Sequence, residues 1–323
     1  MGARGGVVVV GSFNVDHVWR CAELPAPGAT LAGEYASGPG GKGFNQAMAA
    51  ARAGAATTFL CALGDDPGAA LARRLAADDG IDLRAAASGA RTGTAGIFVD
   101  AGGRNSIVIG AGANADLDVA SVESHADALR GAAVVLAQLE SPLDSIARAL
   151  ELARDGGALA VLNPAPANAT TTGDLLRLAD LLTPNETEFA AMLARHCGVD
   201  IGADAVAATG DATLHGLCRQ LLPGGSVVVT LGGAGCFVSH PDAARRGDAA
   251  VHYRVPAERV APVDTTGAGD AFNGALAASL AGGPSDFATH VRFASRYAAL
   301  STEAHGAALA MPTRAGLAKR FPA

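Results

Sequence analysis

The sequence has no long apolar stretch and very little lysine. Only Lys42 and Lys319 among its 24 basic residues are lysines, and 31 acidic residues bring the formal net charge to −7. Nucleic-acid binding normally requires clustered Lys and Arg that neutralise phosphates, so we expect no nucleic-acid partner. No apolar run approaches the roughly 20 residues that span a bilayer, and residues 7–10 are too few for the apolar core of a signal sequence. We therefore expect a cytoplasmic protein without a membrane partner.

Cysteine is also scarce and follows no pattern. The five cysteines are an odd number, lie far apart and include no Cys-x-x-Cys pair. Disulfide frameworks and structural zinc sites usually show closely spaced pairs. The sequence therefore predicts reduced, mostly buried thiols.

Short β-branched runs alternate with helix-like segments along the 323 residues. The strand-like runs cover residues 7–10, 57–62, 134–136, 159–162, 180–183 and 227–230, and helical apolar spacing covers 68–79, 143–154 and 205–222. Strands buried on both faces of a sheet form continuous apolar runs. The alternation therefore predicts an α/β fold, a doubly wound, mostly parallel sheet flanked by helices. Without a linker or a repeat, we predict a single domain over residues 1–323.

Two segments interrupt this alternation. Residues 17–37 and 92–111 carry alternating strand-like patterns with turn signals. Because α/β folds bind ligands outside the carboxyl ends of their strands, we predict that these segments form a small β lid there.

Asp264–Asp270 is the most informative segment and precedes a helix-like stretch. Backbone N–H groups of Gly267, Ala268 and Gly269 would lie at the helix N-terminus, where the partial positive charge favours a phosphate. Asp270, in the first turn, is placed to accept a proton from an alcohol beside that phosphate. The alternative is an ordinary helix start in which Asp270 only complements the helix dipole.

Two segments near the N-terminus offer polar groups for a small ligand. The i, i+2 spacing of Asn14 and Asp16 puts both on one face of a strand, where they suit vicinal hydroxyls; an Asx-turn is the alternative. The glycine-rich turn over residues 38–45 leads into a helix-like run over residues 46–53, and Lys42 and Asn45 offer a cation and an amide at the helix start. An exposed lysine in a flexible turn is the alternative there. The Walker A spacing is absent.

Three further segments follow predicted strands. Asn185 and Glu188 have the spacing of a capping box, and Glu188 equally suits a carboxylate that holds water on Mg²⁺. The glycine-rich segment Thr230–Gly235 suits close passage of a nucleotide. Glu140 ends a buried strand, where an unpaired carboxylate is costly.

Together and in this order, four of these motifs resemble the ribokinase family of carbohydrate kinases over nearly the whole chain. The motifs are Gly11–Asp16, Gly40–Gly43 with Asn45, Asn185-x-x-Glu188 and Asp264–Asp270. The resemblance implies a ribokinase-like fold and ATP-dependent phosphorylation of D-ribose at its 5-hydroxyl. Asp270 would be the catalytic base, and Gly267, Ala268 and Gly269 would form an anion hole.

The resemblance also implies binding residues, cations and an oligomer. Ribose would contact Asn14, Asp16, Gly41, Lys42, Asn45, Glu140 and Asp270. ATP would contact Asn185, Thr230, Gly232, Gly235 and Gly269. Mg²⁺ would be held through water by Glu188, and K⁺ by Asp264, Thr266, Ser301, Ala304 and Gly306. A homodimer would form through the lid.

The sequence departs from the family pattern at a few positions. Ala310 stands where the cation loop often carries Ser, and Ser295 where His often flanks the adenine. Phe44 and Gly267 stand where Ala is common. Alternatives to ribose are a nucleoside or a ketose as acceptor, and a sugar or nucleotide sensor without turnover. A dinucleotide-dependent dehydrogenase is disfavoured because Phe13 breaks the Gly-x-Gly-x-x-Gly pattern after the first strand.

Overall fold

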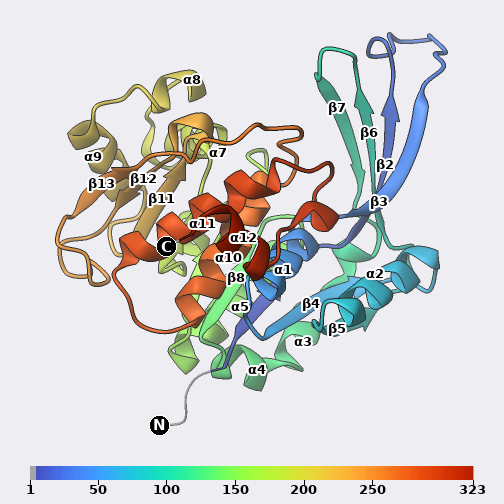
Figure 1. Cartoon of the computed structure of the whole chain (residues 1–323). Helices are drawn as coiled ribbons and strands as arrows, with labels where there is room; N and C mark the ends of the chain where they lie inside the picture. The colour runs from blue at the N-terminus through green and yellow to red at the C-terminus, as the bar shows by residue number, and fades with distance from the viewer. Residues whose placement is uncertain (1–4, 323) are drawn as a thin grey trace.

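A nine-stranded sheet is the centre of the computed structural model, which describes residues 5–322 (Figure 1). Neighbouring strands from β11 to β5 run parallel, and β12 and β13 add an antiparallel edge. All six strand-like runs of the sequence lie in this sheet, so the prediction of a mostly parallel sheet is confirmed. The order across the sheet is β13 (His252–Val255), β12 (Cys236–Ser239), β11 (Ser226–Thr230), β10 (Leu181–Leu182), β9 (Leu159–Leu162), β8 (Val134–Ala137), β1 (Val7–Val10), β4 (Thr57–Leu63) and β5 (Asp82–Ala87).

Helices cover both faces of this sheet. Alternation along β1 sends Val7 and Val9 into one apolar core and Val8 and Val10 into the other. The first core is closed by α1 (Lys42–Arg52), α2 (Pro67–Asp78), α10 (Ala268–Ala281), α11 (Phe287–Ser301), the 3-10 helix η3 (Ala308–Ala310) and α12 (Arg314–Arg320). The second is closed by η1 (Gly112–Asp116), α3 (Val119–Glu123), α4 (Ala126–Gly131), α5 (Leu143–Gly156), α6 (Gly173–Arg177), α7 (Glu186–Cys197), α8 (Ala203–Val206) and α9 (Asp211–Leu221). A short 3-10 helix, η2 (Gly232–Ala234), joins β11 to β12.

One predicted helix is interrupted. The apolar spacing over residues 205–222 predicts continuous helix, whereas α8 ends at Val206 and α9 begins at Asp211. Gly210 lies between them with an extended backbone at ψ 144°, because glycine gains little from a helical conformation. Within residues 5–322, no helix has both the length and the apolar character needed to cross a bilayer.

A second sheet of four strands stands apart from the body at the upper right of Figure 1. Its order is β3 (Glu34–Gly40), β2 (Asn14–Arg20), β6 (Gly93–Val99) and β7 (Asn105–Gly110). The segments 17–37 and 92–111, which interrupt the strand–helix alternation in the sequence, supply most of this second sheet. Trp19 stacks on Phe98 with ring centroids 5.3 Å apart and lies 5.2 Å from Tyr35. The N-terminal end of β2 enters the body, so Asn14 is buried.

Helices α1 and α10 pack closely side by side, and a glycine makes this possible. A Cβ atom at Gly274 of α10 would lie 2.4 Å from the carbonyl oxygen of Gln46 and 2.5 Å from Cβ of Ala49. No side chain fits between backbones at that distance. The two helix N-termini are thereby held together at the carboxyl end of the parallel strands.

Candidate active site

The carboxylate of Asp270 is buried between α1 and α10. Asp270 lies in the first turn of α10 and is 7% exposed. Its Oδ2 accepts a hydrogen bond of 2.8 Å from Nδ2 of Asn45, and its Oδ1 accepts one of 2.9 Å from Nε2 of Gln46. Burial raises the pKa of Asp270 above its usual value, while Lys42 and the two amides act in the opposite direction. The carboxyl group is therefore buried, and an amide donor holds each of its two oxygens.

Backbone N–H groups surround the start of α10 as the sequence predicts, with one exception. Gly267 precedes the helix in the left-handed region at φ 75°, a conformation that favours glycine. The N–H of Ala268 donates to the carbonyl of Thr265 at 3.2 Å, so it is not free for a ligand. Within residues 5–322 the N–H groups of Gly267, Gly269 and Asp270 have no such partner. At the start of α10, these three N–H groups are therefore available to a ligand, whereas the N–H of Ala268, which the sequence analysis includes in the anion hole, is not.

Three more charged groups lie near Asp270. Glu140 follows β8 and accepts hydrogen bonds through Oε2 from the Ser12 hydroxyl at 2.6 Å and the Lys42 backbone N–H at 3.0 Å. Burial opposes the charge of the Lys42 ammonium, but Asp270, Glu140 and Glu188 raise its pKa overall. One cation is thus shared among several carboxylates.

Asp16 of β2 faces the same cluster. Burial, followed by repulsion from Glu140 and Asp270, raises the pKa of Asp16 to about 7. Next to it, the side chain of Asn14 is oriented by Asn114, whose Nδ2 donates to Asn14 Oδ1 at 2.8 Å. The donating Nδ2 of Asn14 is left for a ligand. Gly41 is the N-cap residue of α1, so it lies beside Lys42.

A polar atom of Asn45 is buried without a partner. Asn45 Nδ2 donates to Asp270, but its Oδ1 makes no hydrogen bond within residues 5–322. Leaving a buried acceptor unpaired costs free energy unless a ligand supplies the donor. A ligand hydroxyl beside Asp270 would satisfy this atom.

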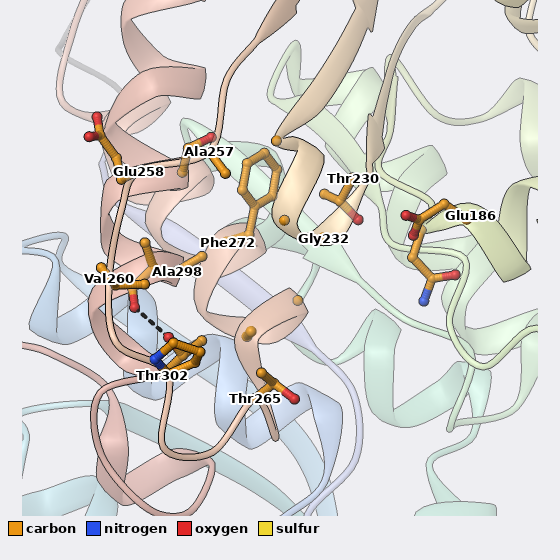
Figure 2. Close-up of a pocket in the computed structure, with 18 residues that line it drawn as sticks. Glu186, Thr230, Gly232, Ala257, Glu258, Val260, Thr265, Phe272, Ala298 and Thr302 are labelled. Atoms are coloured by element: carbon orange, nitrogen blue, oxygen red, sulfur yellow. Dashed lines mark hydrogen bonds between the residues drawn. The ribbon is translucent and has the colours of Figure 1, made fainter. Parts of the chain in front are cut away.

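Two cavities meet at the start of α10. The smaller, of 160 Å³, contains Lys42, Glu188 and Asp270 in its lining. The larger, of 390 Å³, is lined mainly by small and apolar residues, among them Val260, Phe272 and Ala298 (Figure 2). Both are lined by Asn185, Thr230, Thr265, Ala268 and Gly269. The arrangement suits a ligand with a flat apolar end and a charged end that reaches Asp270.

Sequence comparison identifies the family. A family model described as pfkB family carbohydrate kinase matches residues 5–314. The chain belongs to this family. The ribokinase-like fold predicted from the four motifs is thereby confirmed.

Similar proteins of the family come from distant organisms. The chain is 36% identical over 314 residues to a ribokinase of Haemophilus influenzae, with 96% of each chain covered. It is also 36% identical over 314 residues to a bifunctional ribokinase/ribose-5-phosphate isomerase A of Fructilactobacillus sanfranciscensis, where the match covers 95% of this chain and 54% of the longer relative. A structure of Arabidopsis thaliana ribokinase complexed with ribose and ATP superposes with a TM-score of 0.82 at 27% identity, covering 97% of both chains.

The Asn-x-x-Glu pair of this carbohydrate kinase forms a capping box. Asn185 Oδ1 accepts from the N–H of Glu188 at 2.8 Å, and Glu188 Oε2 accepts from the N–H of Asn185 at 2.9 Å. The structural alternative raised by the spacing is therefore correct. It does not exclude a ligand, because Asn185 Nδ2 and Glu188 Oε1 are left over and both residues line the smaller cavity.

Thr230 and Gly232 line the larger cavity together with Gly235 and Ser295. The residues predicted to contact ATP are therefore gathered around one cavity, at the ends of β10 and β11. Ser295 comes from α11, on the opposite wall.

The two segments expected to bind a monovalent cation lie side by side. The carboxylate of Asp264 accepts from the N–H of Thr266 at 2.9 Å and from the N–H of Gly306 at 3.0 Å. Although burial opposes it, these hydrogen bonds hold the pKa of Asp264 below its usual value. The Ser301 hydroxyl donates to the carbonyl of Ala298, and the Ser301 carbonyl accepts from the N–H of Ala304 at 3.4 Å. Asp264 thus joins the two loops.

Several residues of the site carry no role in the sequence analysis. Ser12, Gln46, Asn114, Asn163 and Gln138 all contribute buried hydrogen bonds around Asp270, Glu140 or Asn14. Gln46 directly follows Asn45 at a helix start, and this adjacency is the one signal that points to it. The others come from separate segments, and their shared hydrogen bonds appear where these segments meet at one edge of the sheet.

Proposed function

We propose that this chain transfers the γ-phosphoryl group of ATP to the 5-hydroxyl of D-ribose, which gives D-ribose 5-phosphate and ADP. The observation that carries the proposal is the meeting of an apolar and a polar cavity at the start of α10, where Asp270 lines the polar one and Asn45 beside it has an unpaired buried acceptor. Relatives named ribokinase match over nearly the whole chain, and the Arabidopsis ribokinase superposes along its full length. These facts support a sugar kinase with ribose as acceptor.

The mechanism follows from the position of Asp270. As the 5-oxygen attacks the γ-phosphorus, its proton passes to the Asp270 carboxylate, and the bond between the γ-phosphorus and the β,γ-bridging oxygen breaks. The backbone N–H groups of Gly267, Gly269 and Asp270 stabilise the charge that develops on the phosphoryl oxygens. Lys42 adds a positive charge from the opposite helix.

The sugar is held by the polar groups around Asn45. In this proposal Asn14 donates to a hydroxyl through Nδ2, Asp16 accepts from neighbouring hydroxyls, and Asn45 Oδ1 accepts another. Gly41, Lys42 and Glu140 complete the site. An acceptor that lacks one of these hydroxyls leaves a buried polar atom unpaired, which is how such sites discriminate.

Residues near the nucleotide cavity fit Mg²⁺. Within residues 5–322 no three His, Cys, Asp or Glu side chains come together as a ligand cage, whereas Mg²⁺ usually keeps several waters and takes one or two carboxylates. Glu188, buried with Oε1 available, is such a carboxylate. Bound there with ATP, Mg²⁺ would neutralise phosphate charge.

The loops joined by Asp264 fit a monovalent cation such as K⁺. Thr266, Ser301, Ala304 and Gly306 supply backbone carbonyls in the two loops, and rings of carbonyls are typical ligands of K⁺. The charge of the cation would add to the positive end of α10. Ala310 offers no side-chain oxygen, so the ligands would come from the other positions.

The four-stranded sheet would serve as a lid and pair with the lid of a second copy. Its strand β7 exposes Ile107, Val108 and Ile109, with Val108 68% exposed, and contiguous exposed apolar residues mark interaction sites. A homodimer would cover them. Sedimentation of Val108→Asp should then give a monomer, whereas Val119→Asp on α3 should sediment as wild type.

A coupled assay of ATP turnover tests the function. D-ribose, D-fructose, adenosine and 2-deoxyribose are compared as acceptors with Mg²⁺ and either K⁺ or Na⁺. Turnover that depends on ribose and rises with K⁺ supports both the acceptor and the cation loop. Turnover with another acceptor alone would reassign the substrate, and none with any acceptor would contradict kinase activity.

A further inference from the structure

A chain of buried amides ends at the Asp270 carboxylate. Gln138 Nε2 donates to Gln46 Oε1 at 2.6 Å, and Gln46 Nε2 donates to Asn163 Oδ1 at 3.0 Å and to Asp270 Oδ1 at 2.9 Å. Gln46 and Gln138 are fully buried, and Asn163 is 5% exposed. These amides come from α1 and from the ends of β8 and β9.

The direction of this chain is fixed by a backbone carbonyl. Asn163 Nδ2 donates to the carbonyl oxygen of Thr183 at 2.9 Å. A carbonyl can only accept, so Asn163 must present Oδ1 to Gln46. Gln46 must in turn present its NH₂ group, and both of its hydrogens are then used, one on Asn163 and one on Asp270. Its Oε1 is held in place by Gln138.

This direction has a consequence for the protonation of Asp270. Gln46 can only donate to Oδ1, and Asn45 Nδ2 donates to Oδ2. A proton on Oδ1 would face the N–H of Gln46, and a proton on Oδ2 would face that of Asn45. Both contacts therefore favour the ionised carboxylate.

We propose that Gln46 is a positioning residue that keeps Asp270 ionised and oriented as the proton acceptor, because Asn163 and Gln138 hold its amide in one direction. The inference rests on the proposed role of Asp270 in phosphoryl transfer. Gln46 itself does not touch the sugar or the phosphate in this proposal.

Charged groups from other elements also act on Asp270. Burial is the largest influence and raises its pKa, Lys42 on α1 lowers it, and Glu140 after β8 raises it. Asp16 on β2 and Glu188 on α7 also repel it, since Asp270 raises the pKa of both. Among these groups of residues 5–322, Lys42 is the cation that opposes several anions, and the amide of Gln46 adds to its effect.

The test is the acid side of the pH profile of kcat in Gln46→Met, with ribose and ATP saturating. We use kcat because Asp16 titrates near pH 7 in the free enzyme, whereas kcat reports groups of the bound complex. Loss of one charge-assisted hydrogen bond should move the half-maximal pH upward by about one unit. Activity should return toward wild type at higher pH.

Ser145→Ala is the matched control. Ser145 is 1% exposed and donates to the carbonyl of Leu117 at 2.7 Å, away from Asp270. The Ser145→Ala variant should be less stable, because a buried hydrogen bond is missing, and should keep the wild-type pH profile of kcat. A Gln46→Met profile that is lowered evenly at all pH values, with an unmoved acid limb, would overturn the proposal.

Gln46→Glu provides a second variant of the same size. Its second carboxyl oxygen would face the acceptors of Asn163 and Asp270, so the half-maximal pH should rise in this variant as well. Failure of Gln46→Met to fold therefore leaves the proposal testable, and an unmoved acid limb in Gln46→Glu would refute it.

An infrared titration separates this inference from the proposed function. The carboxylic acid band of Asp270, assigned by difference from Asp270→Asn, reports its protonation without turnover. A band that appears at higher pH in the Gln46 variants supports the inference even if ribose is not the acceptor. A band at the wild-type pH contradicts it even if ribose is phosphorylated.

Discussion

Two hydrogen-bond networks among residues 5–322 each include an aspartate carboxylate, and they have different consequences. Around Asp270, amides of α1 hold a carboxylate that lines a cavity. Around His240, Nδ1 pairs with the Ser226 hydroxyl at 2.8 Å and Nε2 with Asp248 at 3.1 Å, and Tyr253 donates to the same carboxylate.

The second network has the residue types of a hydrolase triad, but within residues 5–322 it lacks the accessible cavity that such a triad needs. His240 is fully buried, and burial lowers its pKa, so it is neutral. None of Ser226, His240, Asp248 or Tyr253 lines either of the two cavities beside α10. A site therefore needs an opening and an unpaired polar atom in addition to the residue types.

Replacing Asp270 is the most direct test of the difference between the two networks. Asp270→Asn keeps the size of the side chain but removes the proposed proton acceptor, so kcat should fall by about 10³-fold. The unfolding temperature should stay close to wild type or rise, because a buried charge is lost. Steady-state kinetics and thermal unfolding measure the two effects. An Asp270→Asn protein with wild-type kcat would exclude the residue as the base.

Asp248→Ala should give the opposite result. Its carboxylate accepts from Tyr253, from His240 and from the N–H of Ala288 at 3.1 Å, and the variant leaves these donors buried and unpaired. We expect a loss of about 3 kcal/mol in the free energy of unfolding, measured by urea titration. A decrease in kcat at a temperature where the variant is folded would contradict the structural role of this network.

Filling the larger cavity tests the role of this cavity independently of the hydrogen bonds around Asp270. Ala298→Leu adds a branched side chain to the apolar wall seen in Figure 2. The KM for ATP should rise roughly tenfold, which corresponds to about 1.4 kcal/mol, and the KM for ribose should not change. If both constants rise together, the cavity does not serve the nucleotide alone.

The smallest effect concerns Asp16, which is repelled by Glu140 and Asp270. Its pKa of about 7 means that the ionised acceptor is lost as the pH falls below 7, so the KM for ribose should rise roughly fivefold from pH 7 to pH 6. The KM for ATP is the internal control. A KM for ribose that is constant over this range would show that the ionised form is not needed.

Ionised Asp16 should favour ribose binding but lower the stability of the folded chain. Its pKa is higher in the folded chain than its ordinary value of 3.8, so the ionised form disfavours folding and this penalty grows as the pH rises through 7. Asp16→Asn should therefore raise the unfolding temperature more at pH 8 than at pH 5. An equal gain at both pH values would mean that the charge is not responsible.

Much of the fold follows from local patterns in the sequence. Valine runs such as residues 7–10 are buried on both faces, and this leaves a continuous apolar signal. The interruption at Gly210 was not predicted, because the apolar spacing of α8 and α9 continues through it.

The site was predictable where one short segment carries several functional groups. Asp264–Asp270 combines the helix start and the proposed base, and Lys42 and Asn45 share one turn of α1. The amide chain through Gln138 and Asn163 joins residues more than 90 positions apart, so its hydrogen bonds could not be predicted from the sequence. The exception at Ala268 also depends on a tertiary detail, its hydrogen bond to Thr265.

Gly274 constrains the evolution of this protein. It has no chemical group to offer, yet a methyl group there would collide with the backbone of Gln46 and part the helices that bring Asn45 and Gln46 to Asp270. Selection for catalysis would therefore act on a position that is four residues from the proposed base and makes no contact with the substrate. Lineages that keep the reaction are expected to tolerate change at the cavity walls long before they tolerate any side chain at this crossing point.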